Sequence, residues 1–243
     1  MTRRMWLGWI LALALLVGAL VALLALPVVK EWEIHLPDNP AVQVDEQAVK
    51  ALLQPFEGQR FLTLPLDQVR QAVMRHPWVA DARVVRIWPD RVRIEVMYQR
   101  PVARWGERAL VNEYGVVFYP SHLQGFEQLL RLDGPEVQDA AELLTMAVWL
   151  RQQMGLKGWQ LIGVKRHAGG SVETRWWPQR TIWGEMEDYR AQFSRFMAAW
   201  PQVRSALREA AISVDLRYSN GFTIRTEQLS GSDGQHGAQK TEQ

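Results

Sequence analysis

The sequence has 243 residues, with 28 lysines and arginines against 26 aspartates and glutamates, and its net charge of +2 is too small to indicate nucleic-acid binding. It contains no cysteine, which excludes disulfides, thiolate catalysis and cysteine-ligated metal sites. Twelve tryptophans are many for this length, and we interpret them as core and membrane-interface residues rather than a dedicated recognition surface.

An uncharged apolar run of 24 residues, Trp6 to Val29, lies close to the N-terminus. As a helix it is roughly 36 Å long, enough to cross a hydrocarbon core of ~30 Å. A secretory signal has a shorter apolar region, commonly of about 7–15 residues, and the stretch 25–28 (Ala-Leu-Pro-Val) is a poor cleavage site. We therefore predict a retained transmembrane helix over 6–29, with a cleaved signal peptide as the alternative.

The charges that flank this run set its expected orientation. Arg3 and Arg4 precede it, whereas Lys30 is the only nearby basic residue after it. The positive-inside rule then places a short tail, residues 1–5, in the cytoplasm and residues 30–243 on the far side. The sequence thus predicts a single-pass type II protein of the inner membrane.

Residues 30–98 have the pattern of a small α+β domain. The predicted order is strand–helix–helix–strand–strand, and prolines follow both helices. In the last strand, valine, isoleucine and tyrosine alternate with arginine and glutamate, which is typical of a strand with one buried face. The predicted strands are 31–36, 81–88 and 91–98, and the predicted helices are 44–53 and 66–75.

Residues 99–227 are mostly strand-like and carry two helical patterns, so we predict a mostly antiparallel β domain with two helices. A polar tail over 228–243 is predicted to be disordered. The predicted strands are 102–105, 109–112, 116–119, 127–131, 159–166 and 171–177, and the predicted helices are 134–153 and 185–200.

The last hairpin of this domain allows its register to be predicted. Strands 212–218 and 222–226 flank Ser-Asn-Gly at 219–221. A three-residue loop pairs Tyr218 with Phe222 and keeps the apolar side chains of both strands on one face, whereas a two-residue Asn-Gly turn mixes the faces. Strand 222–226 is then the last of its sheet, and we expect an edge with unpaired backbone groups.

Motifs of enzymes are absent from the sequence. It has no nucleophile elbow, phosphate-binding glycine loop or metalloprotease helix. No two histidines have metal-ligand spacing, and each is interpreted as a surface residue. We therefore predict no catalytic residue, metal, cofactor or small-molecule substrate. The histidines are His35, His76, His122, His167 and His236.

Four segments together resemble the bacterial cell-division family FtsQ (DivIB). They are HPWVADARVVRIWPD at 76–90, RPVARW at 100–105, NEYG at 112–115 with Phe118, and VDLRYSNGF at 214–222. The resemblance covers residues 6–226 in the order anchor, POTRA domain and β domain. It implies a non-enzymatic scaffold of the divisome, located at the septum.

The resemblance also implies partners. Members of the family bind FtsB and FtsL outside the membrane, link early and late division proteins, and help regulate septal peptidoglycan synthesis by FtsW and FtsI; FtsK is a further expected partner. In the family, a partner segment adds a strand to the last strand of the β domain. The runner-up hypothesis is a POTRA-containing component of secretion or outer-membrane assembly, and the third is an anchored cell-wall hydrolase.

The family's contact residues carry over to the last hairpin. Tyr218 and Asn220 are expected to contact the partner, Arg217 is a candidate charge-assisted donor, and Phe222 and Ile224 belong to the pairing strand. The alternative is that Tyr218 and Phe222 only close the core. Four further residues are expected to be packing and turn residues of the POTRA motif, namely Pro77, Trp78, Trp88 and Pro89.

The sequence departs from the family pattern at several places. The cytoplasmic tail is very short, which puts any cytoplasmic contact in doubt. Tyr98 stands where the family usually has a glutamate, and Trp183 replaces an aliphatic residue. Thr226 stands where a tryptophan often closes the final strand, so one aromatic contact to the partner is expected to be missing.

Overall fold

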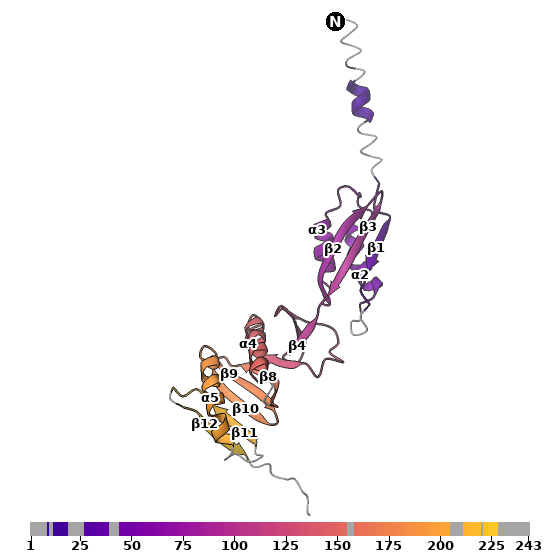
Figure 1. Ribbon diagram of the computed structural model, residues 1–243. Coiled ribbons are helices and arrows are strands. Elements are labelled where there is room, and N and C mark those ends of the chain that lie inside the picture. The colour runs from indigo at the N-terminus through magenta and orange to yellow at the C-terminus, as the bar shows by residue number, and fades with distance from the viewer. Residues whose placement is uncertain are drawn as a thin grey trace, which may run out of the picture. The chain divides into compact units, whose positions relative to one another are not determined.

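The chain divides into two compact units, residues 1–100 and 101–243, which are described separately (Figure 1). The structure is a computed structural model that describes residues 9, 12–18, 27–38, 44–154, 158–204, 211–219 and 221–227. Among these residues, no helix is both apolar enough and long enough to span a membrane. The predicted cytoplasmic tail, most of the predicted transmembrane helix and the predicted C-terminal tail lie outside the described residues.

The N-terminal unit has the predicted order of strand, two helices and two strands. Strand β3 is central, with β1 parallel to it on one side and β2 antiparallel on the other. A short 3-10 helix, η1, lies between α2 and α3 and was not predicted from the sequence. The elements are β1 (Glu31–His35), α2 (Glu46–Leu53), η1 (Gln54–Phe56), α3 (Leu66–Val73), β2 (Val79–Ile87) and β3 (Arg91–Tyr98).

Local sequence signals explain where helix α2 begins and ends. The carboxylate of Asp45 accepts a hydrogen bond from the N–H of Ala48 and so caps α2, which leads into a 3-10 turn at Pro55. Both helices pack their apolar sides on one face of the sheet. Val69 on α3 and Ile94 on β3 are fully buried in this shared core.

The core of this unit includes residues that the sequence analysis placed in the membrane span. Val29 is only 9% exposed, and its N–H donates to the carbonyl of Gln59 at 3.1 Å. The N–H of Phe61 donates to the carbonyl of Pro27 at 2.8 Å. Residues 27–29 therefore belong to the folded unit. The apolar run that precedes them, 6–26, has 21 residues and is still roughly 31 Å long as a helix.

The C-terminal unit is built on one sheet of nine strands in the order β12-β11-β10-β9-β8-β7-β4-β5-β6. Five neighbouring pairs are antiparallel and three are parallel, so the prediction of a mostly antiparallel domain is confirmed. The strands are β4 (Pro101–Trp105), β5 (Ala109–Asn112), β6 (Val117–Phe118), β7 (Leu130–Asp133), β8 (Gln160–Arg166), β9 (Ser171–Trp177), β10 (Arg180–Glu185), β11 (Ala211–Asp215) and β12 (Thr223–Glu227).

Two helices, α4 (Asp139–Met154) and α5 (Tyr189–Arg204), cover one face of this sheet (Figure 1). Aromatic residues of α5 dominate the core: the ring of Phe193 stacks on Trp176 of β9 with centroids 5.9 Å apart. Trp159 lies edge-on to Trp200 at 5.0 Å, which closes the core at the end of α5. The opposite face of the sheet has no helix over it among the described residues.

Strand β10 was missed by the sequence analysis. Residues 180–185 pair with β9 and, in parallel, with β11, so Glu185 ends a strand instead of starting a helix. Helix α5 begins at Tyr189 and continues through Pro201 to Arg204. The turn at 186–188 separates the two elements, so the predicted helix start at 185 lies four residues before the observed one.

The predicted register of the last hairpin is wrong by two residues. Val214 pairs with Ile224 and Asp215 with Thr223, which leaves a seven-residue connection over 216–222. The N–H of Leu216 donates to the carbonyl of Trp183 at 2.8 Å, so Leu216 stays with β10 instead of pairing across the hairpin. The shift is even, so the apolar side chains still share one face.

Candidate functional site

Strand β12 lies at one end of the nine-stranded sheet, and among the residues that the structure describes it pairs with β11 alone. The other end is β6, which has only two residues, Val117 and Phe118. An edge strand leaves a row of backbone N–H and C=O groups unpaired, and such a row is a template for another strand. With five residues, β12 is the longer of the two edges and the better candidate for pairing with another chain.

The segment that leads into β12 is fixed to the rest of the unit. Leu216 is buried at 1% exposure, and the guanidinium of Arg195 on α5 donates to the carbonyl of Ser219 at 2.9 Å. The ring of Phe222 lies edge-on to Phe196, with centroids 5.2 Å apart. The edge is therefore held in place before any partner arrives, which lowers the entropy lost on binding.

The predicted contact residues have different surroundings. Tyr218 is 54% exposed, whereas Phe222 and Ile224 are half-buried and pack against the core. Closing the core is thus a good description of Phe222 and a poor one of Tyr218. Asn220 lies outside the described residues.

Arg217 forms a two-pronged ion pair with Asp215. Its Nε and Nη2 atoms lie 2.9 and 2.7 Å from the two carboxylate oxygens, and its backbone N–H donates to the same carboxylate at 3.1 Å. The hydrogen bond from the Arg217 side chain holds the pKa of Asp215 below its ordinary value. The same contact raises the pKa of Arg217. The charge of Arg217 is therefore largely balanced within the chain.

A hollow of about 270 Å³ opens on the sheet face that α4 and α5 leave uncovered, beside β12. Two arginines, Arg217 and Arg225, line this hollow with one carboxylate, Asp215, which leaves an excess of positive charge. The charge of Arg225 also lowers the pKa of Asp215, although among the described residues it does not approach the carboxylate closely enough to form an ion pair. Arg225 was not predicted from the sequence, although its position next to Ile224 in an alternating strand places it on the outer face. The lining residues are Trp183, Ser213, Asp215, Arg217, Thr223 and Arg225.

The predicted motif residues of the N-terminal unit fall into two groups. Pro77 and Trp78 precede β2, and Trp78 is buried at 7% exposure, with its carbonyl accepting from the N–H of Gln99 at 2.9 Å. Trp88 and Pro89 lie in the turn between β2 and β3, and Trp88 is 66% exposed. Trp78 is thus a packing residue, whereas most of Trp88 faces solvent.

Metal ligands are not grouped in the part of the chain that the structure describes: no three histidine, aspartate or glutamate side chains lie close enough together to hold a metal ion.

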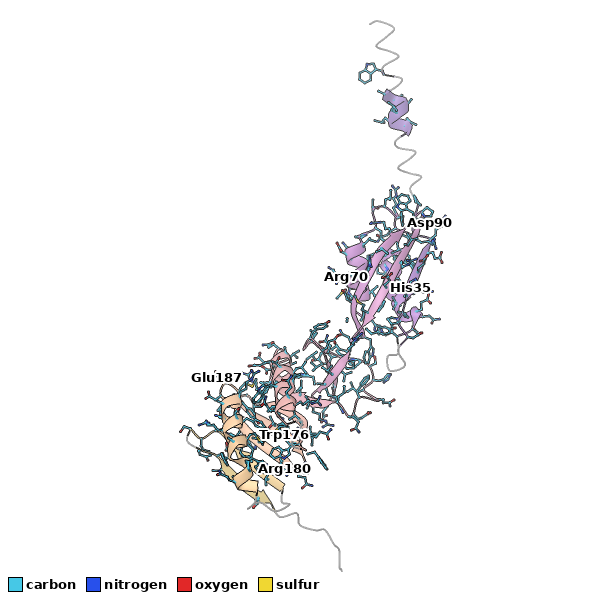
Figure 2. The ribbon with its side chains drawn as sticks, in the orientation of Figure 1. His35, Arg70, Asp90, Trp176, Arg180 and Glu187 are labelled. Atoms are coloured by element: carbon cyan, nitrogen blue, oxygen red, sulfur yellow. The ribbon has the colours of Figure 1, made fainter. Side chains whose placement is uncertain are left out.

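The buried polar side chains of the C-terminal unit include Thr174, whose hydroxyl contacts Tyr189 and Trp176. Figure 2 shows Trp176 in this unit. The edge strand β12 can pair with a strand of another chain, and the positively charged hollow beside it can bind an anionic side chain.

Two family models match the chain, one in each unit. Residues 39–97 match the FtsQ-type POTRA domain, and residues 103–217 match the C-terminal domain of cell division protein FtsQ/DivIB. The cell division protein FtsQ of Bordetella pertussis is 30% identical over 223 residues, which cover 84% of this chain and 81% of the relative. The chain belongs to the FtsQ family.

Other FtsQ proteins match at similar levels. The Xanthomonas campestris protein is 29% identical over 94% of this chain and 82% of its own length, and the Thiomonas arsenitoxydans protein is 31% identical over 76% and 71%. The family identified from the sequence motifs is therefore confirmed, together with the POTRA domain and a role in cell division. The FtsQ/DivIB model ends at Arg217, so β12 follows the matched segment.

Proposed function

We propose that this chain is a non-enzymatic scaffold of the division machinery that binds FtsB and FtsL outside the inner membrane. The observation that carries the proposal is the position of β12, a five-residue strand at the edge of a nine-stranded sheet. Membership of the FtsQ family supports the division role and disfavours the secretion and hydrolase alternatives. The scaffold links early and late division proteins at the septum, where FtsK, FtsW and FtsI are further partners.

In the proposed complex, a segment of FtsB adds a tenth strand next to β12. Backbone hydrogen bonds along the edge supply affinity, and the side chains beside it supply specificity. Tyr218, which is 54% exposed, offers an aromatic contact at one end of the strand. The excess of positive charge in the hollow, with Arg217 and Arg225 against Asp215, favours an acidic side chain of the partner there. Arg217, already paired with Asp215, contributes less to that attraction.

The proposal places the apolar run 6–26 across the membrane, with residues 1–5 in the cytoplasm. Both folded units are then on the periplasmic side, where they meet partners that are themselves anchored in the membrane. Anchoring of both molecules to one membrane raises the effective concentration of the edge for its partner, so a modest intrinsic affinity suffices.

Proline substitutions on the free edge test this function. Successive N–H groups of a strand point to opposite edges, so proline at two neighbouring positions removes one donor to β11 and one donor to the free edge. Arg225 and Thr226 suit this test because both side chains are exposed and neither packs in the core. We expect one of Arg225→Pro and Thr226→Pro to abolish binding with an unchanged unfolding temperature. The other is expected to lower the unfolding temperature.

The binding assay uses the full chain in nanodiscs and a co-purified FtsB–FtsL complex. Arg225→Ala and Thr226→Ala are the matched controls, because they remove the same side chains and keep both backbone donors. Tyr218→Ala is expected to weaken binding without changing the fold. Binding that survives both proline variants rules out strand addition at β12, and the absence of wild-type binding rules out the proposed partners.

A further inference from the structure

Exposed apolar side chains gather at one end of the N-terminal unit. Val28 and Leu62 are each 41% exposed and Trp88 is 66% exposed. They come from three separate segments, namely the start of the unit, the loop after α2 and η1, and the turn between β2 and β3. We refer to these three residues as the apolar patch.

Contacts between the three segments hold the patch together. The ring of Trp88 lies edge-on to Phe61, the neighbour of Leu62, with centroids 5.4 Å apart. The Nε of Arg86 donates to the carbonyl of Phe61 at 2.9 Å, and Val28 forms an isolated β-bridge with Arg60. The patch is therefore a fixed surface of the folded unit.

Basic residues surround the apolar patch. The three segments, 27–30, 59–63 and 86–90, carry the cations Lys30, Arg60 and Arg86 and a single carboxylate, Asp90, which leaves a net charge of +2. Asp90 pairs with Lys30 at 2.9 Å, and Figure 2 labels it at this end of the unit. Three exposed apolar side chains beside an excess of cations match the chemistry of an anionic lipid surface.

The same end of the unit directly follows the apolar run 6–26. The carbonyl of Pro27 accepts from the N–H of Phe61 at 2.8 Å, so the first residue after the run is already bonded to the loop that carries Leu62. One residue spans at most about 3.6 Å. The polar headgroup layer on each side of a bilayer is roughly 5–8 Å thick. A transmembrane run that ends at Leu26 therefore leaves no linker to lift the patch away from the headgroups.

We propose that the apolar patch and its basic neighbours bind the headgroup layer of the membrane that anchors the chain. The inference rests on the proposed transmembrane anchor. The indole of Trp88 enters the interface, where its ring meets both apolar and polar surroundings. The exposed residues Lys30 and Arg60 lie among the lipid phosphates, whereas the guanidinium of Arg86 donates to the carbonyls of Phe61 and Leu64 and holds the loop in place. The contact ties the POTRA domain to the bilayer surface and restricts the directions in which it can tilt.

Single-cysteine labelling of the full chain tests this inference, because the sequence has no native cysteine. Each variant, Trp88→Cys, Leu62→Cys, Met97→Cys and Leu16→Cys, carries one environment-sensitive fluorophore. The protein is reconstituted alone in vesicles of phosphatidylethanolamine and phosphatidylglycerol. Met97 is the matched control because it is 50% exposed but far from the apolar patch. It lies six residues along β3, about 20 Å, from Arg91, which directly follows the turn that carries Trp88.

We expect nitroxide lipids to remove most of the emission at positions 88, 62 and 16, and aqueous iodide to remove it at 97. Leu62→Cys retains Trp88, and circular dichroism checks that each variant is folded. Lipid quenching at 16 with iodide quenching at 88 and 62 overturns the inference and leaves the anchor intact. Iodide quenching at 16 as well overturns the anchor itself. Replacing phosphatidylglycerol by phosphatidylcholine is expected to weaken the lipid quenching at 88, and an unchanged signal overturns the role of the cations.

Discussion

Thr174 lies where three polar groups meet inside the apolar core of the C-terminal unit. Its Oγ1 is 2.6 Å from the hydroxyl of Tyr189, accepts from Nε1 of Trp176 at 2.9 Å and lies 3.3 Å from the carbonyl of Ile182. Burial raises the pKa of Tyr189, so its hydroxyl stays protonated and remains a hydrogen-bond donor at any physiological pH. One threonine therefore satisfies groups from β9, β10 and α5.

Thr174→Val is expected to lower the free energy of unfolding of the C-terminal unit by roughly 1–3 kcal/mol. The substitution keeps the side chain's shape but leaves the Tyr189 hydroxyl and the Trp176 N–H buried without this partner. Urea denaturation followed by tryptophan fluorescence measures the change. Thr174→Ser is the control: it keeps the hydroxyl and loses one methyl group, which costs about 0.8 kcal/mol. A valine variant as stable as the serine variant contradicts the prediction.

The candidate site shows which of its residues a family motif can identify and which it cannot. The motif directed attention to Tyr218 and Arg217, because both stand at positions that the family pattern contains, and their contact with a partner stays a prediction. It did not identify Arg225, since the pattern says nothing about which cation is balanced by a neighbour. That difference depends on the contact between Arg217 and Asp215, which requires coordinates. Exposure separates Tyr218 from Phe222 for the same reason.

Helix α5 approaches β10 closely at Gly184. A Cβ at this position would lie 2.7 Å from Cδ2 of Tyr189 and 2.8 Å from Oε1 of Gln192. Gln192 in turn accepts from the N–H of Glu185 at 3.2 Å, so the start of the helix is bonded to the end of the strand. The absence of a side chain at Gly184 allows the two elements to pack at this distance.

Gly184→Ala is expected to destabilise the C-terminal unit by about 1–3 kcal/mol, because the added methyl group displaces the start of α5. Gly169→Ala is the matched control, since a Cβ there meets no atom within 4 Å. Its effect is expected to stay within about 0.5 kcal/mol. Thermal denaturation of both variants measures the difference, and an equal effect of the two substitutions shows that the close approach is not limiting.

Elements that depend on local signals could be predicted from the sequence, whereas those that depend on distant partners could not. The whole order of the N-terminal unit follows from prolines, caps and alternation within each segment. Strand β10 was missed because the segment 180–185 is short and has no clear pattern of its own. Its pairing with β9 and β11 identifies it as a strand. The register of β12 was wrong because Leu216 bonds to Trp183, a residue that lies outside the hairpin.

The described parts of the chain form two hydrophobic cores that share no residue. The core of the N-terminal unit is formed by its three strands and the two helices that precede β2 and β3, and the core of the C-terminal unit lies between α4, α5 and the nine-stranded sheet. Stability that comes from burial is then gained separately in each unit. A domain of 50–200 residues with its own core is able to fold alone, and both units are within about this range.

The full chain is therefore expected to unfold in two transitions, which substitutions in the two cores move independently. Val69 is fully buried, and Val69→Ala is expected to cost about 2 kcal/mol in the N-terminal unit alone. For a domain of 60–100 residues, each kcal/mol shifts the unfolding temperature by roughly 4–8 °C, so the shift is easily resolved. Thr174→Val is expected to move only the other transition. Differential scanning calorimetry of the full chain in detergent measures both, and one transition that both substitutions lower contradicts independent cores.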